Sequence, residues 1–448
     1  MSGYTPHTEA EIDSMLEFLG LESIDELFAA VPLALRLAGG TGLAPGAPEP
    51  DVLVRMRRLA AANRPISEEL VCFAGGGAYD REVPPVTRAL ASRSEFVTSY
   101  TPYQPEVAQG VLQALFEFQT LVARLTGMEV ANASLYDGAA ALVEAVNLCV
   151  SATGREHVWV SQGVNPSWRQ VLSTFAAGTG HAIEVLPLAD GSTAWPPDRD
   201  AEAPAAVVVS YPNYLGCLED LSEARALCDR TGAMLVVAFD PICAGLLRSP
   251  GDWRADVVVG EGQPLGMPLG FGGPYLGLFA CNSANVRRLP GRLVGETVDA
   301  EGRRAYVTTL RAREQDIRRE KATSNVCTNQ TLMAVTAAIQ MGWLGTSGIA
   351  EVALRSARGA DYCRKALLAV TGVEPLVSAP TMGEFALRLP VDASLLVERL
   401  ADDGFLAGIA LDDEYTQGRR DGLLVAVTER RTRSEIDSFA DSFAKALR

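Results

Sequence analysis

The chain has 448 residues, of which 48% are hydrophobic and 21% are charged, and its formal net charge is −16. This length exceeds what one hydrophobic core usually supports, so two or more packed units are expected. The excess of 55 acidic over 39 basic residues argues against sequence-independent binding to nucleic acid or anionic lipid, which needs a basic surface. No apolar run reaches membrane-spanning length and the acidic N-terminus lacks the features of a signal peptide, so a cytoplasmic location is expected.

Cysteine and histidine usage gives no sign of disulfides or of a metal centre. The chain has eight cysteines but no C-x-x-C pair, and Cys72, Cys149, Cys243 and Cys281 lie in apolar segments, which is typical of buried thiols. Its three histidines are never close together in sequence, so a histidine-based metal site is not expected.

The first 70 residues are predicted to form a helical arm. Thr8 to Glu11 has a capping-box pattern before a helix that runs through Leu19, and Ser23 to Glu26 has the same pattern. A third helix is expected over 51–63. None of these helices is long enough to form a domain alone, so their apolar faces must be buried against the main body or another chain.

The stretch 94–138 contains a polar loop followed by a long helix. Pro102 and Pro105 fix φ and disfavour a helix before Pro105, so a rigid loop is expected, and Pro105 suits the first turn of a helix that ends at Gly127. Six side chains of this loop can form hydrogen bonds: Thr98, Ser99, Tyr100, Thr101, Tyr103 and Gln104. Such groups are costly to bury without partners, which makes the loop a candidate contact surface.

A second polar segment, 132–138, ends in Asp137 and Gly138 at the predicted start of a helix. Free N–H groups and the helix dipole would make this helix start a plausible anion cradle. An ordinary loop and helix cap explains the same pattern, and on spacing alone the ordinary cap is favoured.

Strands and helices alternate from about residue 71 to 280. Helical patterns separate apolar, β-branched runs, as in a mostly parallel sheet buried on both faces. The expected strands are 157–160, 205–210, 233–239 and 256–259. A smaller α/β domain is expected in the remainder, with helices at 330–344 and 348–370, a strand at 384–389, a helix at 393–402, a strand at 423–427 and a final helix from Ser434.

Several motifs occur in order through nearly the whole chain. They are FAGGGAYD at 73–80, SEFVTSYTPYQPEVAQGVLQALFEFQT at 94–120, NASLYDGA at 132–139, YPN at 211–213, VVVGEGQPLGMPLGFGGPYLG at 257–277, IRREKATSNVCTNQ at 317–330 and VTERRTRSEID at 427–437. On these motifs the chain resembles the P-protein family of the glycine cleavage system, glycine dehydrogenase (decarboxylating), in the alpha-chain type of its split form.

The resemblance implies the α/β fold of the pyridoxal 5'-phosphate (PLP)-dependent aminotransferase-like enzymes, fold type I. It implies a helical arm at 1–70, a large domain with a mostly parallel sheet at 71–325 and a small C-terminal α/β domain at 326–448. The implied activity is that of glycine dehydrogenase (aminomethyl-transferring), an oxidoreductase, with this subunit inactive alone. Its partner would be subunit 2, the PLP-bearing beta chain, which decarboxylates glycine and passes the aminomethyl group to the lipoyl H-protein, in an α2β2 heterotetramer.

A PLP enzyme of this fold needs a lysine amine to hold the cofactor covalently. The chain has only three lysines, Lys321, Lys365 and Lys445, and Lys365 has the polar neighbours of a solvated helix face. By resemblance, Gln263 occupies the position at which the lysine-bearing companion subunit has its lysine. Because an amide cannot form a Schiff base, PLP is expected on the partner and not covalently on this chain.

Other positions keep the character of a cofactor site. The resemblance places Asp240 where this fold has the carboxylate that pairs with the pyridinium nitrogen, and it places Asp137 and Gly138 in the phosphate loop. The favoured alternative for Asp240 is that the residue is inherited from a cofactor site and no longer binds a cofactor. Asp240 would then only fill and cap a vestigial site.

The resemblance also implies a contact with the beta chain. We expect Tyr100, Thr101, Tyr103 and Gln104 to reach the PLP pocket of the partner as catalytic-site residues that position the substrate. A second polar cluster is expected from Arg318, Arg319, Lys321, Ser324, Asn325 and Asn329. The alternative for this cluster is a solvated face, with Glu314 and Glu320 as the partners of its cations.

Three positions depart from the family pattern. Arg81, Asn165 and Asp316 stand where alpha chains commonly have histidine, and none of these residues exchanges protons near neutral pH as histidine does. Either those histidines are structural, or this chain is a diverged paralogue that partners a PLP enzyme acting on another amino acid. A purely structural scaffold without contact to substrate is the third hypothesis.

Overall fold

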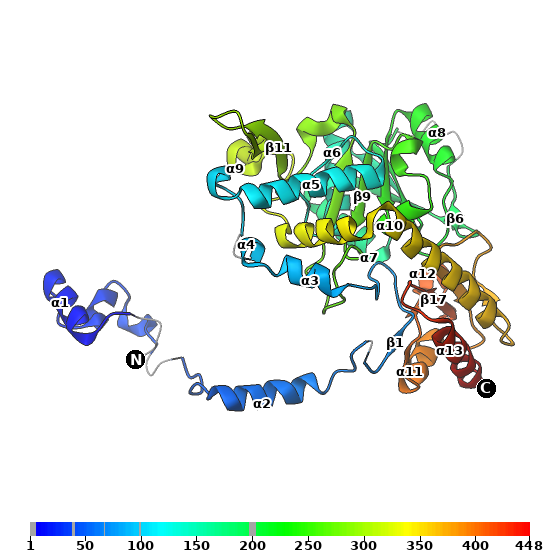
Figure 1. Ribbon diagram of the computed structural model, residues 1–448, viewed down its shortest axis with the longest axis horizontal. Coiled ribbons are helices and arrows are strands. Elements are labelled where there is room, and N and C mark those ends of the chain that lie inside the picture. Colours follow the sequence, from blue (N-terminus) through cyan, green and yellow to red (C-terminus); the bar gives the residue numbers. More distant parts are fainter. Residues whose placement is uncertain (1–5, 38–40, 67, 98–99, 197–202) are drawn as a thin grey trace. The chain divides into compact units, whose positions relative to one another are not determined.

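The computed structural model describes residues 6–37, 41–66, 68–97, 100–196 and 203–448, and the chain divides into two compact units, Met1–Arg64 and Pro65–Arg448 (Figure 1). The first unit contains α1 (Glu9–Leu19), the 3-10 turns η1 (Ile24–Phe28) and η2 (Leu33–Leu35), and α2 (Glu49–Ala60). Thr8 caps α1 with the predicted capping box. The second predicted capping box is wrong, because Ser23 donates its hydroxyl hydrogen to Glu26 instead of capping the following 3-10 turn.

Taken by itself, the first unit leaves its apolar side chains uncovered. Among its described residues none is buried, and Phe18, Leu33 and Leu43 are 90%, 80% and 83% exposed. Apolar side chains this exposed on several consecutive elements are typical of a surface that the rest of the chain or another chain covers, and the choice between these two stays a prediction.

A seven-stranded sheet forms the centre of the second unit. Its order is β2-β10-β9-β8-β7-β3-β4, and the strands from β9 to β4 run parallel while β10 is antiparallel to both of its neighbours. The strands are β2 (Val130–Ala131), β3 (His157–Ser161), β4 (Ala182–Leu186), β7 (Ala206–Tyr211), β8 (Met234–Phe239), β9 (Val257–Glu261) and β10 (Gly277–Cys281). The four predicted strands are confirmed as β3, β7, β8 and β9, whereas β2, β4 and β10 were not predicted.

Alternate residues of the central strands serve two different cores. On β7, Val207 and Val209 belong to one core, and Ala206 and Val208 belong to the other. The first core is closed by α5 (Gln109–Thr126), α8 (Leu221–Thr231) and α10 (Thr331–Leu368), and the second by α6 (Gly138–Thr153) and α7 (Pro166–Thr179). With helices on both faces, side chains at the carboxyl ends of the parallel strands can line a site at the sheet edge.

The helix predicted after Pro105 begins later than expected. Pro105 starts the 3-10 turn η3 (Pro105–Val107), and α5 follows from Gln109 and ends at Gly127 in the left-handed conformation. The other short helices and turns of this unit are α3 (Pro85–Ala91), α4 (Ser94–Val97), η4 (Pro241–Gly245), η5 (Pro250–Trp253), η6 (Ser283–Arg288), η7 (Arg311–Arg313), α9 (Gln315–Arg318), η8 (Arg319–Lys321) and α12 (Asp413–Thr416). Two hairpins, β5 (Leu188–Ala189) with β6 (Ser192–Thr193) and β11 (Leu293–Val298) with β12 (Arg304–Thr309), complete the large sheet region.

The long helix α10 joins the two helices predicted at 330–344 and 348–370. They meet at Gly345, where φ of 60° and ψ of −175° interrupt the helix. By length and composition α10 could cross a membrane, contrary to the sequence expectation, because an 18-residue window reaches a mean hydropathy of 1.2. Part of its apolar surface packs inside the protein, with Ala337 in the first core of the large sheet and Leu367 in the C-terminal core, while Trp343 is exposed.

The C-terminal region has the predicted elements. A four-stranded antiparallel sheet, β13-β14-β17-β16, packs against α11 (Ala393–Asp402) and α13 (Arg433–Ala446). Its strands are β13 (Glu374–Pro375), β14 (Glu384–Arg388), β16 (Ile409–Ala410) and β17 (Gly422–Ala426). Nearby, β1 (Val71–Cys72) pairs with β15 (Phe405–Leu406), and Phe73 lies in the C-terminal core. The domain boundaries predicted at 70 and 325 stay predictions.

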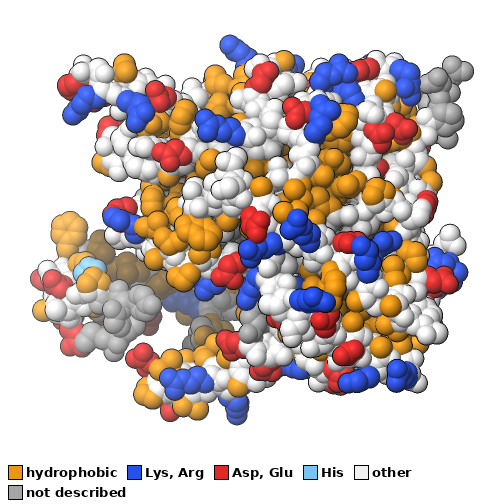
Figure 2. Space-filling model, turned by 45° about the vertical axis from the view of Figure 1, so that its right-hand side comes forward, with side chains coloured by type: hydrophobic (Ala, Val, Ile, Leu, Met, Phe, Trp, Pro, Cys, Tyr) orange, Lys and Arg blue, Asp and Glu red, His pale blue; other side chains and the backbone are white. Residues whose placement is uncertain are grey.

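The cysteines are free thiols, and seven of the eight are buried. Cys72, Cys149, Cys243 and Cys281 are among the buried ones, as predicted, and Cys327 is exposed. On the face shown in Figure 2, the described basic and acidic side chains are interspersed, so that face has no basic patch of the kind that nucleic acid needs.

Candidate functional site

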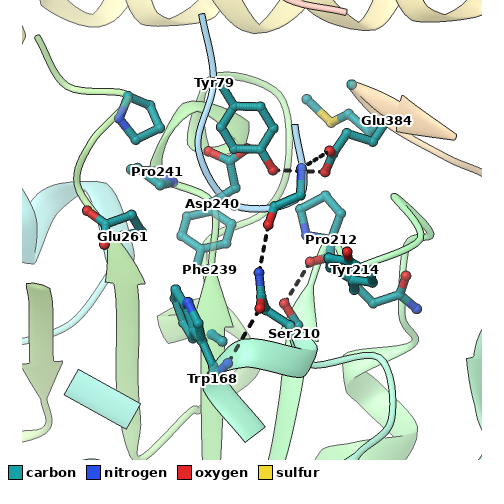
Figure 3. Close-up of a pocket in the computed structure, with 18 of the residues that line it drawn as sticks. Tyr79, Trp168, Ser210, Pro212, Tyr214, Phe239, Asp240, Pro241, Glu261 and Glu384 are labelled. Carbon is teal, nitrogen blue, oxygen red and sulfur yellow. Dashed lines mark hydrogen bonds between the residues drawn. The ribbon is translucent and has the colours of Figure 1, made fainter. Parts of the chain in front are cut away.

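A cavity of about 90 Å³ lies at the carboxyl ends of β7, β8 and β9 (Figure 3). Its lining comes from the 76–81 segment, the start of α7, the ends of these strands and the start of β14. The side chains that decide its chemistry are Tyr79, Arg81, Trp168, Asp240, Glu261 and Glu384. Three carboxyl groups and several aromatic rings therefore converge on one small volume.

Glu384 closes the cavity from the C-terminal region. Its side chain is buried, and its two carboxylate oxygens accept hydrogen bonds from Gly76 N at 2.6 Å and from the Tyr79 hydroxyl at 2.8 Å. Burial raises the pKa of Glu384 to about 7, and the charge of nearby Asp240 adds to this shift. Burial also raises the pKa of Tyr79 well above its usual range. Within the pair, Glu384 is therefore the group that titrates near neutral pH.

Arg81, one of the departures from the family pattern, is buried beside the cavity in an ion pair. Its Nη1 lies 2.6 Å from Oε2 of Glu429 and donates to the Ser356 hydroxyl at 3.2 Å. Its guanidinium carbon also lies 5.4 Å from the centre of the Tyr79 ring. The side chain at this position therefore holds segments together and does not exchange protons.

The other two departures also make structural contacts. Asn165 caps α7 by accepting a hydrogen bond from Ser167 N, and its amide donates to Gly76 O at 2.7 Å. Asp316 is exposed and pairs with Arg311 at 3.1 Å. In this chain all three side chains thus make structural contacts.

Asp240 follows β8 and faces the cavity, as the fold resemblance implies. One carboxylate oxygen accepts a hydrogen bond from Ile242 N at 2.9 Å and caps η4, and the other accepts from the Cys243 thiol at 3.6 Å. The capping of η4 by Asp240 agrees with the vestigial interpretation of this residue. The choice between a vestigial role and a cofactor-binding role for Asp240 stays a prediction.

Gln263, at the predicted lysine position, is fully buried and is not one of the residues that line the cavity. Its Oε1 accepts a hydrogen bond from Tyr79 N at 2.9 Å, and its Nε2 donates to Tyr79 O at 3.0 Å and to Met267 O at 2.7 Å. The amide thus pairs with both backbone groups of Tyr79 and fixes the segment that carries the tyrosine. A lysine could not accept the hydrogen bond from Tyr79 N.

The predicted anion cradle at the start of α6 is occupied by two carboxylates of the chain itself. Asp137 caps the helix by accepting from Ala140 N at 2.7 Å, as an ordinary helix cap would. Oε2 of Glu261 accepts from Gly138 N at 3.0 Å, while its Oε1 accepts from Gln263 N and Leu276 N, each at 2.9 Å. Burial raises the pKa of Glu261 to about 7.

Trp168 covers the same helix start. A Cβ atom added to Gly138 would lie 2.2 Å from Cζ2 of Trp168, so the indole packs directly on this glycine. Covalently held PLP needs a lysine amine, free N–H groups for its phosphate and space above the helix start. In the described part of the chain the residues at these places are Gln263, Glu261 and Trp168, and they do not fit PLP.

The predicted polar loop lies elsewhere. Thr98 and Ser99 are outside the described residues, and Tyr100, Tyr103 and Gln104 are exposed, the tyrosines by 77% and 61%. Thr101 and Tyr103 line a second cavity of about 210 Å³, where the Arg292 guanidinium lies 5.6 Å from the centre of the Tyr103 ring. The cavity beside this loop shares none of its described lining residues with the cavity of Figure 3.

The second predicted polar cluster does not form one site. Asn329 is buried, accepts a hydrogen bond from Arg292 at 2.8 Å and donates to Ala133 O at 2.8 Å, so it supports the core. Arg318, Arg319, Lys321 and Asn325 are exposed and Ser324 is half-buried. The cations therefore match the solvated-face alternative. Lys365 pairs with Asp361 at 2.7 Å on an exposed helix face, as predicted.

Four residues of the cavity were not identified from the sequence: Tyr79, Trp168, Glu261 and Glu384. Glu261 follows the predicted buried strand 256–259 by two residues, and a carboxylate buried there must find hydrogen-bond donors, which is a signal that was available. Tyr79 and Glu384 are 305 positions apart, and only the folded chain shows that they meet. Although three carboxyl groups line the cavity, no three Asp, Glu, His or Cys side chains of the described residues lie close enough together to hold one metal ion.

Comparison with known proteins gives matches along the whole chain. The family model of the glycine cleavage system P-protein matches residues 2–443. Two relatives named probable glycine dehydrogenase (decarboxylating) subunit 1 are each 45% identical to this chain. The protein from Geotalea uraniireducens aligns over 99% of this chain and 100% of its own length, and the protein from Moorella thermoacetica aligns over 97% of both.

Solved structures agree with this similarity. The crystal structure of a glycine decarboxylase (P-protein) of the glycine cleavage system, in inhibitor-bound form, is 47% identical with a TM-score of 0.92, covering 99% of this chain and 100% of that one. Alanine–glyoxylate aminotransferase from Nostoc sp. is 15% identical with a TM-score of 0.59, covering 86% and 97%, and this likeness shows the fold alone. The predicted fold class, the aminotransferase-like fold type I, is thereby confirmed.

Proposed function

This chain belongs to the glycine cleavage system P-protein family, and on that premise we propose that it acts as the alpha subunit, subunit 1, of a glycine dehydrogenase (decarboxylating), an oxidoreductase. The observation that carries the proposal is the 45% identity to subunit 1 proteins over both chains from end to end. Nothing in the comparisons supports the alternative of a paralogue acting on another amino acid. Glycine is therefore the proposed substrate.

We propose that PLP is carried by subunit 2, the beta chain, and that this chain completes the active site of the beta chain. When bound to the partner, PLP supplies the electron sink for decarboxylation of glycine. Support comes from the closed cavity of this chain, where Gln263 replaces the lysine and Glu261 takes the backbone donors at the start of α6. The aminomethyl group would then pass to the lipoyl H-protein.

The loop residues Tyr100, Thr101, Tyr103 and Gln104 are proposed to position the partner's substrate. Two arguments support this role. The tyrosines and Gln104 are exposed and thus available to another chain. The loop is also held in place, because Tyr103 N donates to Thr101 O at 2.9 Å and Arg292 lies over the Tyr103 ring. No covalent role is assigned to these side chains.

An α2β2 assembly in the cytoplasm is proposed. The exposed apolar side chains of the first unit, such as Phe18 and Leu33, have the character of a subunit contact. Closed symmetry is the common state of soluble oligomers, so a pair of αβ units is the simplest such assembly.

Co-expression with the beta chain tests the proposal. The two chains should co-elute in size-exclusion chromatography, and the complex should catalyse exchange of bicarbonate with the carboxyl group of glycine, while this chain alone should not. Aspartate or alanine offered in place of glycine serves as the specificity control. A complex that forms but exchanges another amino acid and not glycine would reject the proposed substrate.

A further inference from the structure

We propose that Glu261 is a built-in anion that takes the place of a ligand phosphate at the start of α6, so that this chain closes its own pocket to phosphorylated ligands. The proposal concerns this chain alone and does not depend on what the partner subunit does. It follows from the donors that the carboxylate engages, from the charges around it and from the packing above it.

The donors around Glu261 form a cradle that an anion fits. Gly138 N comes from the first turn of α6, Gln263 N from the turn after β9, and Leu276 N from the residue before β10, and all three donate to this carboxylate at 2.9–3.0 Å. Three backbone N–H groups and a helix N-terminus are the usual donors to a phosphate. Here they converge on a side chain of the same protein.

The close approach of β10 to the helix start brings these donors together. Gly277 pairs with Leu135, and a Cβ atom at Gly277 would lie 2.5 Å from Asp137 O. Only a glycine allows the two backbones to come this near. Leu276, the preceding residue, is thereby brought to the same carboxylate as Gly138.

Charge and packing both act against a second anion. Asp137 already accepts from Ala140 N, so a phosphate would face two carboxylates at one helix start. It would also have to displace Glu261, which would leave the N–H groups of Gln263 and Leu276 without their acceptor. Trp168 fills the space above Gly138. These obstacles are independent of the missing lysine.

The test is anion rescue of Glu261→Ala in the full-length chain, followed by thermal unfolding at constant ionic strength. At about pH 8, one unit above the pKa of this group, the wild-type carboxylate is charged. The variant should unfold at a lower temperature than wild type, and inorganic phosphate should raise its unfolding midpoint by about 1–3 °C over chloride. Because phosphate also stabilises folded proteins in general, the variant should gain more from phosphate over chloride than the wild type does, by about this amount.

Glu144→Ala is the matched control. Glu144 lies on the same helix, is also buried, and burial raises its pKa to about 7, but it is not at the helix start. Its removal should lower the midpoint without any phosphate-specific gain. If Glu261→Ala gains no more from phosphate than Glu144→Ala does, the proposal is overturned.

A second measurement keeps the proposal testable if Glu261→Ala does not fold. In equilibrium dialysis, the wild-type chain should bind neither inorganic phosphate nor pyridoxal 5'-phosphate at millimolar concentration. Saturable binding of one pyridoxal 5'-phosphate per wild-type chain, competed by inorganic phosphate, would contradict the proposal whatever the variants do.

Discussion

Replacement of Gln263 by alanine should lower the free energy of unfolding of the second unit by about 3–6 kcal/mol. The side chain is fully buried and makes three hydrogen bonds, two to the backbone of Tyr79 and one to Met267 O. Its removal leaves one buried and two partly buried backbone groups without partners, and each such group costs about 1–3 kcal/mol. The lower part of the summed range applies because water can enter the space left by the amide.

Urea unfolding monitored by near-UV circular dichroism measures this change, since Tyr79 lies beside the substituted residue. Gln170→Ala is the control, because Gln170 is exposed on α7 and its removal should change stability little. A loss below about 1 kcal/mol for Gln263→Ala would show that the amide does not hold the 79 segment, and would refute the reasoning. Gln263→Lys should lose the same contacts and gain no borohydride-stable PLP adduct, because Glu261 and Trp168 still close the pocket.

Three further predictions concern the titrating pair, the loop and the first unit. Burial raises the pKa of Glu384 from 4.5 to about 7, so its contribution to stability is present below about pH 4.5 and is lost as the pH rises through 7. Glu384→Gln should therefore reduce the fall in unfolding free energy between about pH 5 and pH 8 by up to roughly 3 kcal/mol, and an unchanged fall in urea titrations would count against this role. Tyr103→Phe and Gln104→Ala should each lower turnover of the assembled complex about 10²–10³-fold while size-exclusion profiles stay the same, whereas wild-type turnover in both would leave the loop as architecture only. Phe18→Ser and Leu33→Ser, both at highly exposed positions, should weaken association with the beta chain in sedimentation experiments. The control Leu395→Ser, at an exposed position of α11, should not weaken it. Equal effects of all three substitutions would argue against a contact through the first unit.

The fold was largely predictable from local patterns. The strands that became β3, β7, β8 and β9 are apolar, β-branched runs buried on both faces, and such runs carry a strong signal. Strand β10 lacks this signal, because it opens with Gly277 and none of its five residues is β-branched. The kink in α10 was predictable in part, since the two helical patterns stop on either side of Gly345.

Features of the site were predictable from the sequence only where they depend on the identity of a single residue. The absence of a usable lysine follows from the sequence, and so does Gln263 at its position once the family is identified. The closure of the cavity does not, because it depends on the meeting of Glu261 with Gly138, 123 positions away, and of Glu384 with Tyr79. Hydrogen bonds over such separations leave no periodic pattern in the chain.

The central claim is that this chain completes an active site that the beta chain cannot form alone. A titration of separately purified beta chain with this chain, followed by glycine–bicarbonate exchange, tests it most directly. Exchange should be negligible for either chain alone and should rise to a plateau at one alpha chain per beta chain. Full exchange by the beta chain alone, unchanged on addition of this chain, would contradict the account.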